Sequence, residues 1–450
     1  MIQKTILAAL LVAIPALGVG QSIDAKDFTL PNGLKVVTVE DHTVPSVCFA
    51  VGFHVGSRNE RPGITGISHL FEHMMFNGSR RYPPGEFDRV MEANGGSNNA
   101  YTSEDVTVYY DLFPRAALET IFQLEADRIC CLAFDSLKVE SERGVVYSER
   151  RTTVDNENAS LLSEQVQAAA FVAHPYHHPV IGWPSDIEGW TLQDLKDYFR
   201  IHYAPNNATM LVVGDVTPAE VFALAERTVG PIPPQPPPGP VRTKEPPQIA
   251  ERRVTIRKEG QVPLLQLAYH CGTANDNDIE TLGLLMSVLV DGESSRLYRR
   301  LVDTDRVAVD VGGYADVGFD PGLALFFVTV SPGKGPAAAE SALVDELGRL
   351  GREGPAAAEL TKARNIKLAG YWRSLKTIDG KAEALGHYEV FRGDYRKLFT
   401  APERYGRVTR AEVQALARKL FTERNRTVGV LVPEEPKSAD AAPAGKGGVR

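Results

Sequence analysis

The sequence predicts an α+β fold made of two duplicated α/β-roll domains, each a mostly antiparallel sheet packed with helices. The first observation is a Pro-rich stretch at residues 230–248, GPIPPQPPPGPVRTKEPPQ, which suits neither a sheet nor a helix interior and indicates an extended linker. The second is a similarity between the segments on either side of this linker. The third is that strand-like and helix-like patterns alternate within each segment, as in sheets covered by helices.

Two matches between the segments indicate the duplication. FHVGSRNE at 53–60 aligns with YHCGTAND at 269–276, an offset of 216 residues. TLQDLKDYFRIHYAPNNATMLVVG at 191–214 resembles TRAEVQALARKLFTERNRTVGVLV at 409–432, an offset of 218 residues. Short amphipathic segments can resemble one another by chance, but two matches with nearly one offset favour a repeat. We therefore expect an N-terminal domain at residues 22–229 and a homologous C-terminal domain at 249–432.

Hydrophobic spacing predicts the elements of the first domain. Residues 27–40 and 47–56 alternate or run apolar, as strands do, and TMLVVGD at 209–215 closes the domain as a further strand. Six other stretches carry the apolar spacing of helices. They are residues 64–76, 85–94, 114–129, 136–151, 157–173 and 191–202.

The N-terminus predicts a signal peptide at residues 1–20. One lysine precedes an apolar run from Ile6 to Leu17, and glycines follow at positions 18 and 20, which is the layout of a secretory signal. An uncleaved anchor is the alternative, although the run is short for a membrane span. We expect an exported chain in a bacterial periplasm, with secretion as the second choice. No membrane span is expected after the leader, and the low-complexity tail at 433–450 is expected to be disordered.

Composition excludes some classes of protein. The 450 residues are 43% hydrophobic and 24% charged, which is typical of a globular protein. The net charge of −8 argues against nucleic acid as a partner. Two of the four cysteines, Cys130 and Cys131, are adjacent. Because adjacent cysteines rarely bond to each other, we expect small buried residues and no disulfide framework, with a disulfide pair in the oxidising periplasm as the alternative.

The stretch GISHLFEHMMFNGS at 66–79 predicts a metal site. His69 and His73 are four residues apart, so on a helix they share one face and can point at one ion. Glu72 lies beside them, too close to ligate the same ion comfortably but well placed to touch a water on it. Thr65 is the expected N-cap of this helix. The alternative is a helix that carries histidines incidentally, but two histidines and a glutamate in this spacing favour metal.

A hydrolytic zinc site usually has three protein ligands, and the helical run at 136–151 offers a third. Glu142 and Glu149 are seven residues apart and so lie on nearly the same face. Spacing alone does not decide which of them would ligate, and an acidic helix face is often simply solvated.

The second domain acts as an internal control for the metal site. At the offset of 216, the two histidines fall on Leu285 and Leu289, and Glu72 falls on Val288. The repeat keeps a helix there and lacks every candidate metal residue. The fold therefore does not require these residues, and chemistry explains their presence in the first domain better.

The HLFEH segment resembles the inverted zinc motif of the inverzincins, the family of pitrilysin, insulin-degrading enzyme and mitochondrial processing peptidase. ERGVVYSE is similar to the family segment that carries the glutamate ligand. The resemblance implies one zinc ion per chain, held by His69, His73 and Glu149. It also implies Glu72 as the catalytic base and Glu142 as an auxiliary residue behind a ligand.

Another segment, GGSNNAYTSEDVTVYY at 95–110, is similar to the family's substrate-binding edge strand. The resemblance implies that Asn98, Asn99 and Ala100 pair with an extended peptide, although GGSNN is also a good loop sequence. The implied function is a zinc metalloendopeptidase that hydrolyses peptides or small polypeptides in a closed chamber. The alternative is a non-catalytic structural or assembly subunit on the same fold.

The chain departs from the family pattern at one place. Active members carry an Arg and a Tyr seven residues apart that bind the substrate near zinc, and here these positions fall on Val302 and Val309. Valine can neither donate a hydrogen bond nor carry charge. Arg306 and Tyr314 are the right types but out of register. We therefore expect a heterodimer with a metal-less homologous subunit that supplies the pair, and a homodimer is less expected.

Overall fold

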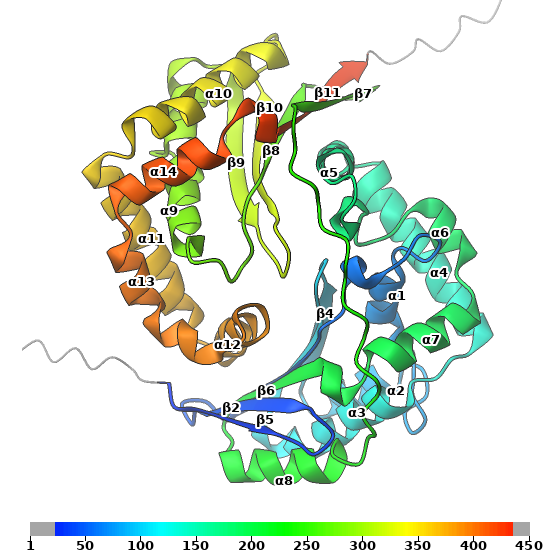
Figure 1. Ribbon diagram of the computed structural model, residues 1–450. Coiled ribbons are helices and arrows are strands. Elements are labelled where there is room, and N and C mark those ends of the chain that lie inside the picture. Colours follow the sequence, from blue (N-terminus) through cyan, green and yellow to red (C-terminus); the bar gives the residue numbers. More distant parts are fainter. Residues whose placement is uncertain (1–22, 435–450) are drawn as a thin grey trace, which may run out of the picture.

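The computed structural model describes residues 23–434. The predicted signal peptide at 1–20 and all of the predicted tail beyond residue 434 lie outside the described residues. Two sheets, each with its own helices, face one another across the molecule (Figure 1). None of the described helices is both long and apolar enough to cross a membrane.

The first sheet has six strands in the order β1-β2-β6-β3-β5-β4. The β2–β6 pair is parallel and the other pairs are antiparallel. The single strand expected at 27–40 is in fact two strands, because Gly33, at φ 89, turns the chain between them. The strands are β1 (Ala25–Thr29), β2 (Lys35–Glu40), β3 (Ser46–Phe53), β4 (Ser97–Thr102), β5 (Thr107–Pro114) and β6 (Ala208–Gly214).

The second sheet has five strands in the order β7-β11-β8-β10-β9. This is the order of the first sheet without β1, and again only the first pair, β7–β11, is parallel. Strand β10 lies 216 residues after β5 over its whole length. The repeated strand order confirms the predicted α+β class with duplicated, mostly antiparallel sheets. The strands are β7 (Arg252–Glu259), β8 (Leu264–His270), β9 (Ala308–Asp316), β10 (Leu323–Val330) and β11 (Arg426–Glu434).

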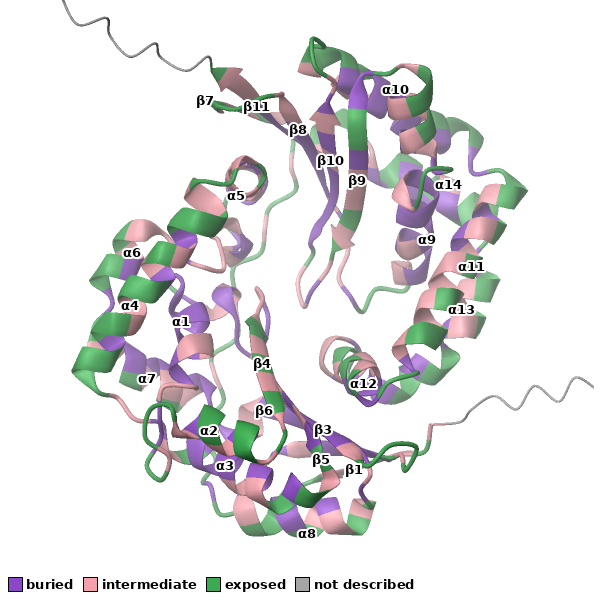
Figure 2. Cartoon of the chain, turned by 180° about the vertical axis from the view of Figure 1, so that it is seen from behind, coloured by how far each residue is buried: buried purple, intermediate pink, exposed green. Residues whose placement is uncertain are grey.

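Helices cover both sheets because the helices present apolar faces that pack into hydrophobic cores. Figure 2 shows buried residues on the helices and strands of both halves. The six helices expected in the first half are present with shifts of up to four residues at their ends. The helices of the first half are α1 (Ile67–Met74), α2 (Glu86–Ala93), α3 (Leu118–Cys131), α4 (Ser136–Arg150), α5 (Asn158–Ala170), α6 (Pro184–Gly189), α7 (Leu192–His202) and α8 (Pro218–Thr228). Those of the second half are α9 (Ile279–Val290), α10 (Pro336–Glu353), α11 (Ala357–Ser374), α12 (Ile378–Arg392), α13 (Ala401–Arg407) and α14 (Arg410–Leu420).

Each half contributes one helix to the sheet of the other half. Helix α12 packs on β3 and β6 of the first sheet, and α5 packs on β8 and β11 of the second (Figure 1). Charged pairs join the same surfaces: Lys35 contacts Glu389 at 2.5 Å, and Lys381 pairs with Asp41. The exchange buries apolar side chains of both halves together, so the halves form one interlocked unit.

The contact of α5 with β11 leaves no room for a side chain at Gly429. A methyl group there would collide with Val166 and lie 3.0 Å from Leu162 Cδ1. Overpacking a core typically costs about 1–3 kcal/mol, so we expect Gly429→Ala to lower the free energy of unfolding by that amount in urea denaturation. Gly312→Ala, on β9 where an added methyl group would meet open space, is the control. Equal stability of the two variants would contradict this account of the interlock.

The cysteine prediction is wrong for one pair. Cys130 and Cys131 form a disulfide with each other, and neither is buried. They are the last two residues of α3 and reach the surface where the helix ends. Cys48 and Cys271 are free and buried, as expected.

Candidate metal centre

Helix α1 carries the two candidate histidines and starts at a glycine. The N-cap is Gly66, at φ 84, and a Cβ at this residue would collide with the backbone of Ile181. The predicted cap, Thr65, is wrong: its hydroxyl donates to Asp186 instead, at 2.7 Å. The free N–H groups of Gly66 and Ser68 donate to the buried Glu60 carboxyl group, at 2.7 and 2.8 Å. This carboxyl group therefore fixes the start of the helix from outside it.

Glu60 makes stability depend on pH. Burial raises the pKa of its carboxyl from 4.5 to about 8. Between these values the folded chain holds a proton that the unfolded chain has released, so stability is lost as the pH rises. In urea denaturation with a chelator present, we expect the free energy of unfolding to fall between pH 5 and pH 8 by on the order of 1–3 kcal/mol more in the parent than in Glu60→Gln.

Asp186→Asn is the matched control for this prediction. Burial acts to raise the pKa of Asp186, but hydrogen bonds from Thr65 and Gly63 outweigh it and lower the pKa. Protonation of Asp186 therefore changes the stability of the fold only below about pH 4. The control should keep the parent's pH dependence between pH 5 and 8. If the free energy of unfolding of Glu60→Gln fell with pH as steeply as that of the parent, Glu60 would not be the cause of the pH dependence.

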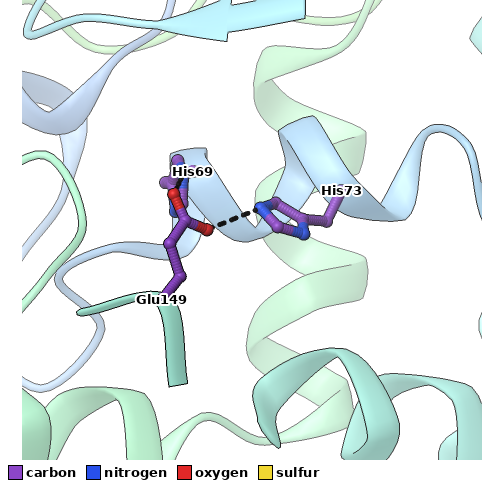
Figure 3. A group of neighbouring side chains, drawn as sticks. All are labelled: His69, His73 and Glu149. Atoms are coloured by element: carbon purple, nitrogen blue, oxygen red, sulfur yellow. Dashed lines mark ion pairs between the residues drawn. The ribbon is translucent and has the colours of Figure 1, made fainter. Parts of the chain in front are cut away.

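His69, His73 and Glu149 come together from two helices, α1 and α4 (Figure 3). Their ligand atoms all lie within 4.8 Å of one another. Glu149 Oε1 lies 3.6 Å from His69 Nε2, and its Oε2 lies 3.3 Å from His73 Nε2. Within residues 23–434 no other cluster of three or more His, Cys, Asp or Glu side chains is arranged to hold a metal.

Glu142 takes a different place from Glu149. Its Oε2 lies 3.4 Å from His73 Nδ1, the ring nitrogen that faces away from Glu149. Their spacing on α4 places both glutamates on nearly the same face, so the sequence could not decide which of them would be the ligand. The tertiary structure distinguishes them. Glu149 shares the space between the histidines, whereas Glu142 supports one ring from behind.

The charge states of His69 and Glu149 suit a cation, whereas His73 would have to release its proton to bind one. Burial lowers the pKa of His69, which favours the neutral imidazole that a metal requires. A hydrogen bond from His73 lowers the pKa of Glu149, which favours the carboxylate. For His73, burial acts to lower the pKa, but the surrounding carboxylates, led by Glu149, raise it. Two imidazoles and one carboxylate form the donor set of hydrolytic zinc sites, so these residues fit a zinc ion.

Glu72 lies on α1 next to this group without belonging to it. Its Oε2 accepts a hydrogen bond from the Thr102 hydroxyl at 2.7 Å. Thr102 is not among the residues predicted from the sequence, because nothing in the local pattern indicates that the end of a strand reaches a helix thirty residues earlier. The one signal available in the sequence was that Thr102 carries a hydroxyl and lies two residues after the residues implied to bind peptide.

Strand β4 holds the three residues expected to bind peptide, Asn98, Asn99 and Ala100. Within residues 23–434 it is the last strand of the first sheet and pairs only with β5. The backbone groups on its outer edge therefore pair with no other described strand, although Ala100 N–H donates to Asn99 Oδ1 at 2.9 Å, and the strand contacts α1 on the helix side of the sheet.

The second half offers no such site at the equivalent helix. In α9, Leu285, Val288 and Leu289 are all buried in the second hydrophobic core. The out-of-register candidates lie elsewhere: Arg306 is exposed at φ 52, and Tyr314 stacks on Phe327 in β9 and β10. Neither belongs to the group of His69, His73 and Glu149.

Comparisons with known proteins identify the family. The model described as "Insulinase (Peptidase family M16)" matches residues 35–183, and that of the "Peptidase M16 inactive domain" matches residues 189–367. The zinc protease PqqE of Helicobacter pylori is 31% identical over 410 residues, covering 90% of this chain and 92% of that protein. The chain belongs to peptidase family M16.

Other M16 relatives agree over nearly the whole chain. The Bacillus subtilis protein named as the uncharacterized zinc protease YmxG is 26% identical over 88% of this chain and 96% of its own length. The crystal structure of a Helicobacter pylori protease superimposes with a TM-score of 0.88 at 29% identity, covering 92% of this chain and 100% of that one. Membership of the M16 family confirms the inverzincin resemblance, and the names of these relatives support a metallopeptidase.

Proposed function

We propose that this chain is a zinc-dependent metalloendopeptidase and the catalytic subunit of a heterodimer. The observation that carries the proposal is the convergence of His69, His73 and Glu149, with Glu72 beside them and a free sheet edge next to the same helix. The substrates would be extended peptides or small polypeptides. They would be enclosed between the two subunits.

The free edge of β4 would bind the peptide. Along Asn98, Asn99 and Ala100, the backbone N–H and C=O groups that point away from β5 would pair with an extended substrate as an added strand. Such pairing gives affinity with little dependence on side chains. It would also hold the substrate beside α1, which contacts β4.

The chemistry would take place at α1. Bound zinc would supply Lewis acidity toward the scissile carbonyl and make a bound water easier to deprotonate. His69, His73 and Glu149 would hold it, and Glu142 would keep the His73 ring in orientation. The Glu72 carboxylate would accept a proton from the attacking water and return it to the leaving amine.

The heterodimer follows from what the chain lacks. Val302 packs partly buried against the second core, and Val309 is 50% exposed on β9. Neither can stabilise a developing oxyanion. A metal-less homologous chain that carries an Arg and a Tyr in these positions would complete the site. Export by the signal peptide at residues 1–20 would place the complex in the periplasm.

Hydrolysis of a quenched fluorescent peptide tests the proposal. The zinc-loaded chain is assayed alone and after mixing with a metal-less M16 chain from the same organism, with Glu72→Gln as the blank. We expect turnover above the blank only in the mixture. Full turnover by the chain alone would refute the heterodimer. No turnover in any mixture would favour a structural or assembly subunit on the same fold.

A further inference from the structure

The contact between Thr102 and Glu72 joins the peptide-binding strand to the helix of the metal centre. Thr102 is the last residue of β4, and its hydroxyl donates to Glu72 Oε2 at 2.7 Å. Within residues 23–434 no other protein group donates a hydrogen bond to this carboxylate. Glu72 itself is only half-buried, so packing alone does not hold its carboxylate in one orientation.

The hairpin that carries Thr102 is well fixed. Thr102 pairs with Thr107 on the neighbouring strand β5. The turn that follows is closed by a hydrogen bond from Ser103 N–H to the Val106 carbonyl, at 2.8 Å. Side chains alternate along β4, so Ala100 and Thr102 face the helix layer, while Tyr101 is 45% exposed on the other face. The strand geometry therefore directs the Thr102 hydroxyl at α1.

A second contact fixes the helix to the same hairpin. The hydroxyl of Tyr109, a buried residue of β5, donates to the Phe71 carbonyl at 3.0 Å. Phe71 directly precedes Glu72, so the backbone of α1 is held at the point from which the Glu72 side chain leaves it. Together the two contacts fix both ends of the Glu72 side chain relative to the edge strand.

We propose that Thr102 is a positioning residue for the catalytic base. Its hydroxyl holds one carboxylate oxygen of Glu72 and leaves Oε1 free to accept the proton of the attacking water. Because Thr102 lies on the strand that binds the peptide, the same hairpin sets the position of the substrate and the orientation of the base. This inference rests on the proposed peptidase function.

Loss of the hydroxyl should therefore act on the chemical step. A general base contributes through its orientation as well as its basicity, and without Thr102 the Glu72 carboxylate can rotate about its terminal torsions. Peptide pairing to the β4 backbone does not use the hydroxyl, so affinity for the substrate should change little.

Two variants separate orientation from bulk. Thr102→Val keeps the shape of the side chain and removes the donor, whereas Thr102→Ser keeps the donor. In the complex that shows Glu72-dependent turnover, we expect Thr102→Val to lower kcat at least roughly tenfold with KM within about twofold, and Thr102→Ser to stay within about threefold of the parent. Equal kcat in Thr102→Val and the parent would overturn the proposal, as would an equal loss in both variants.

Two readouts do not depend on turnover. In crystal structures of the zinc-loaded chain, the Glu72 carboxylate should keep its orientation in Thr102→Ser and lose it in Thr102→Val, and an unchanged orientation in both would overturn the proposal. In the Glu72→Gln background, adding Thr102→Val should leave the calorimetric affinity for an uncleaved peptide unchanged. A fall in affinity would assign Thr102 to peptide binding instead. If the parent shows no Glu72-dependent turnover, the peptidase proposal fails, while the crystal structures still decide the positioning contact.

Discussion

The Glu72→Gln variant should keep its zinc and lose roughly 10²–10⁴-fold in kcat, the usual contribution of a positioned general base. Glu72 lies outside the group of three proposed ligands, so the substitution removes none of the proposed metal donors. The glutamine amide has nearly the same shape but cannot accept a proton near neutral pH. The measurement is steady-state hydrolysis of a quenched peptide by the active complex, with zinc content determined on the same preparation.

Glu92→Gln is the control for this prediction. Glu92 lies exposed on α2, the next helix along the chain, so its substitution changes net charge equally without touching the metal centre. It should leave kcat unchanged. If Glu72→Gln kept the parent's turnover, Glu72 would not be the base, and if it lost zinc, its role would be that of a ligand.

The second large effect is expected at Glu149. Its carboxylate oxygens lie 3.6 Å from His69 Nε2 and 3.3 Å from His73 Nε2, so Glu149→Ala removes one of the three proposed donors. Substituting residues behind the ligands typically costs 10–100-fold in metal affinity, so loss of a ligand should cost more than about a hundredfold. Competition with a chromophoric chelator measures the zinc affinity directly and does not depend on a partner subunit.

Two variants on the same helix α4 make the Glu149 test specific. Glu142→Ala removes the carboxylate behind His73 and should weaken zinc binding by roughly 10–100-fold. Glu140→Ala removes a surface carboxylate that pairs with Arg143 and should have no effect on zinc. Zinc affinity that falls more in Glu142→Ala than in Glu149→Ala would exchange the roles of the two glutamates.

Much of the fold could be predicted because its signals are local. Apolar periodicity located the helices that carry His69, Glu142 and Glu149, and the repeated sequence at an offset of 216 anticipated the repeated strand order. The errors arose where one residue redirects the chain, as at Gly33 and at the Gly66 cap. The disulfide of Cys130 and Cys131 was missed because adjacent cysteines carry no spacing signal.

The sequence by itself determined that two histidines share a helix face with a glutamate beside them, because a separation of four residues fixes their direction on any α-helix. It also determined that the second half lacks such a site. Only the tertiary structure decided that Glu149 and not Glu142 stands between the histidines, because that depends on how α4 crosses α1. It alone decided the exchange of α5 and α12 between the sheets and the contact of Thr102 with Glu72. These contacts join segments far apart in the chain, and their free energy comes from burial and hydrogen bonds that no local pattern encodes.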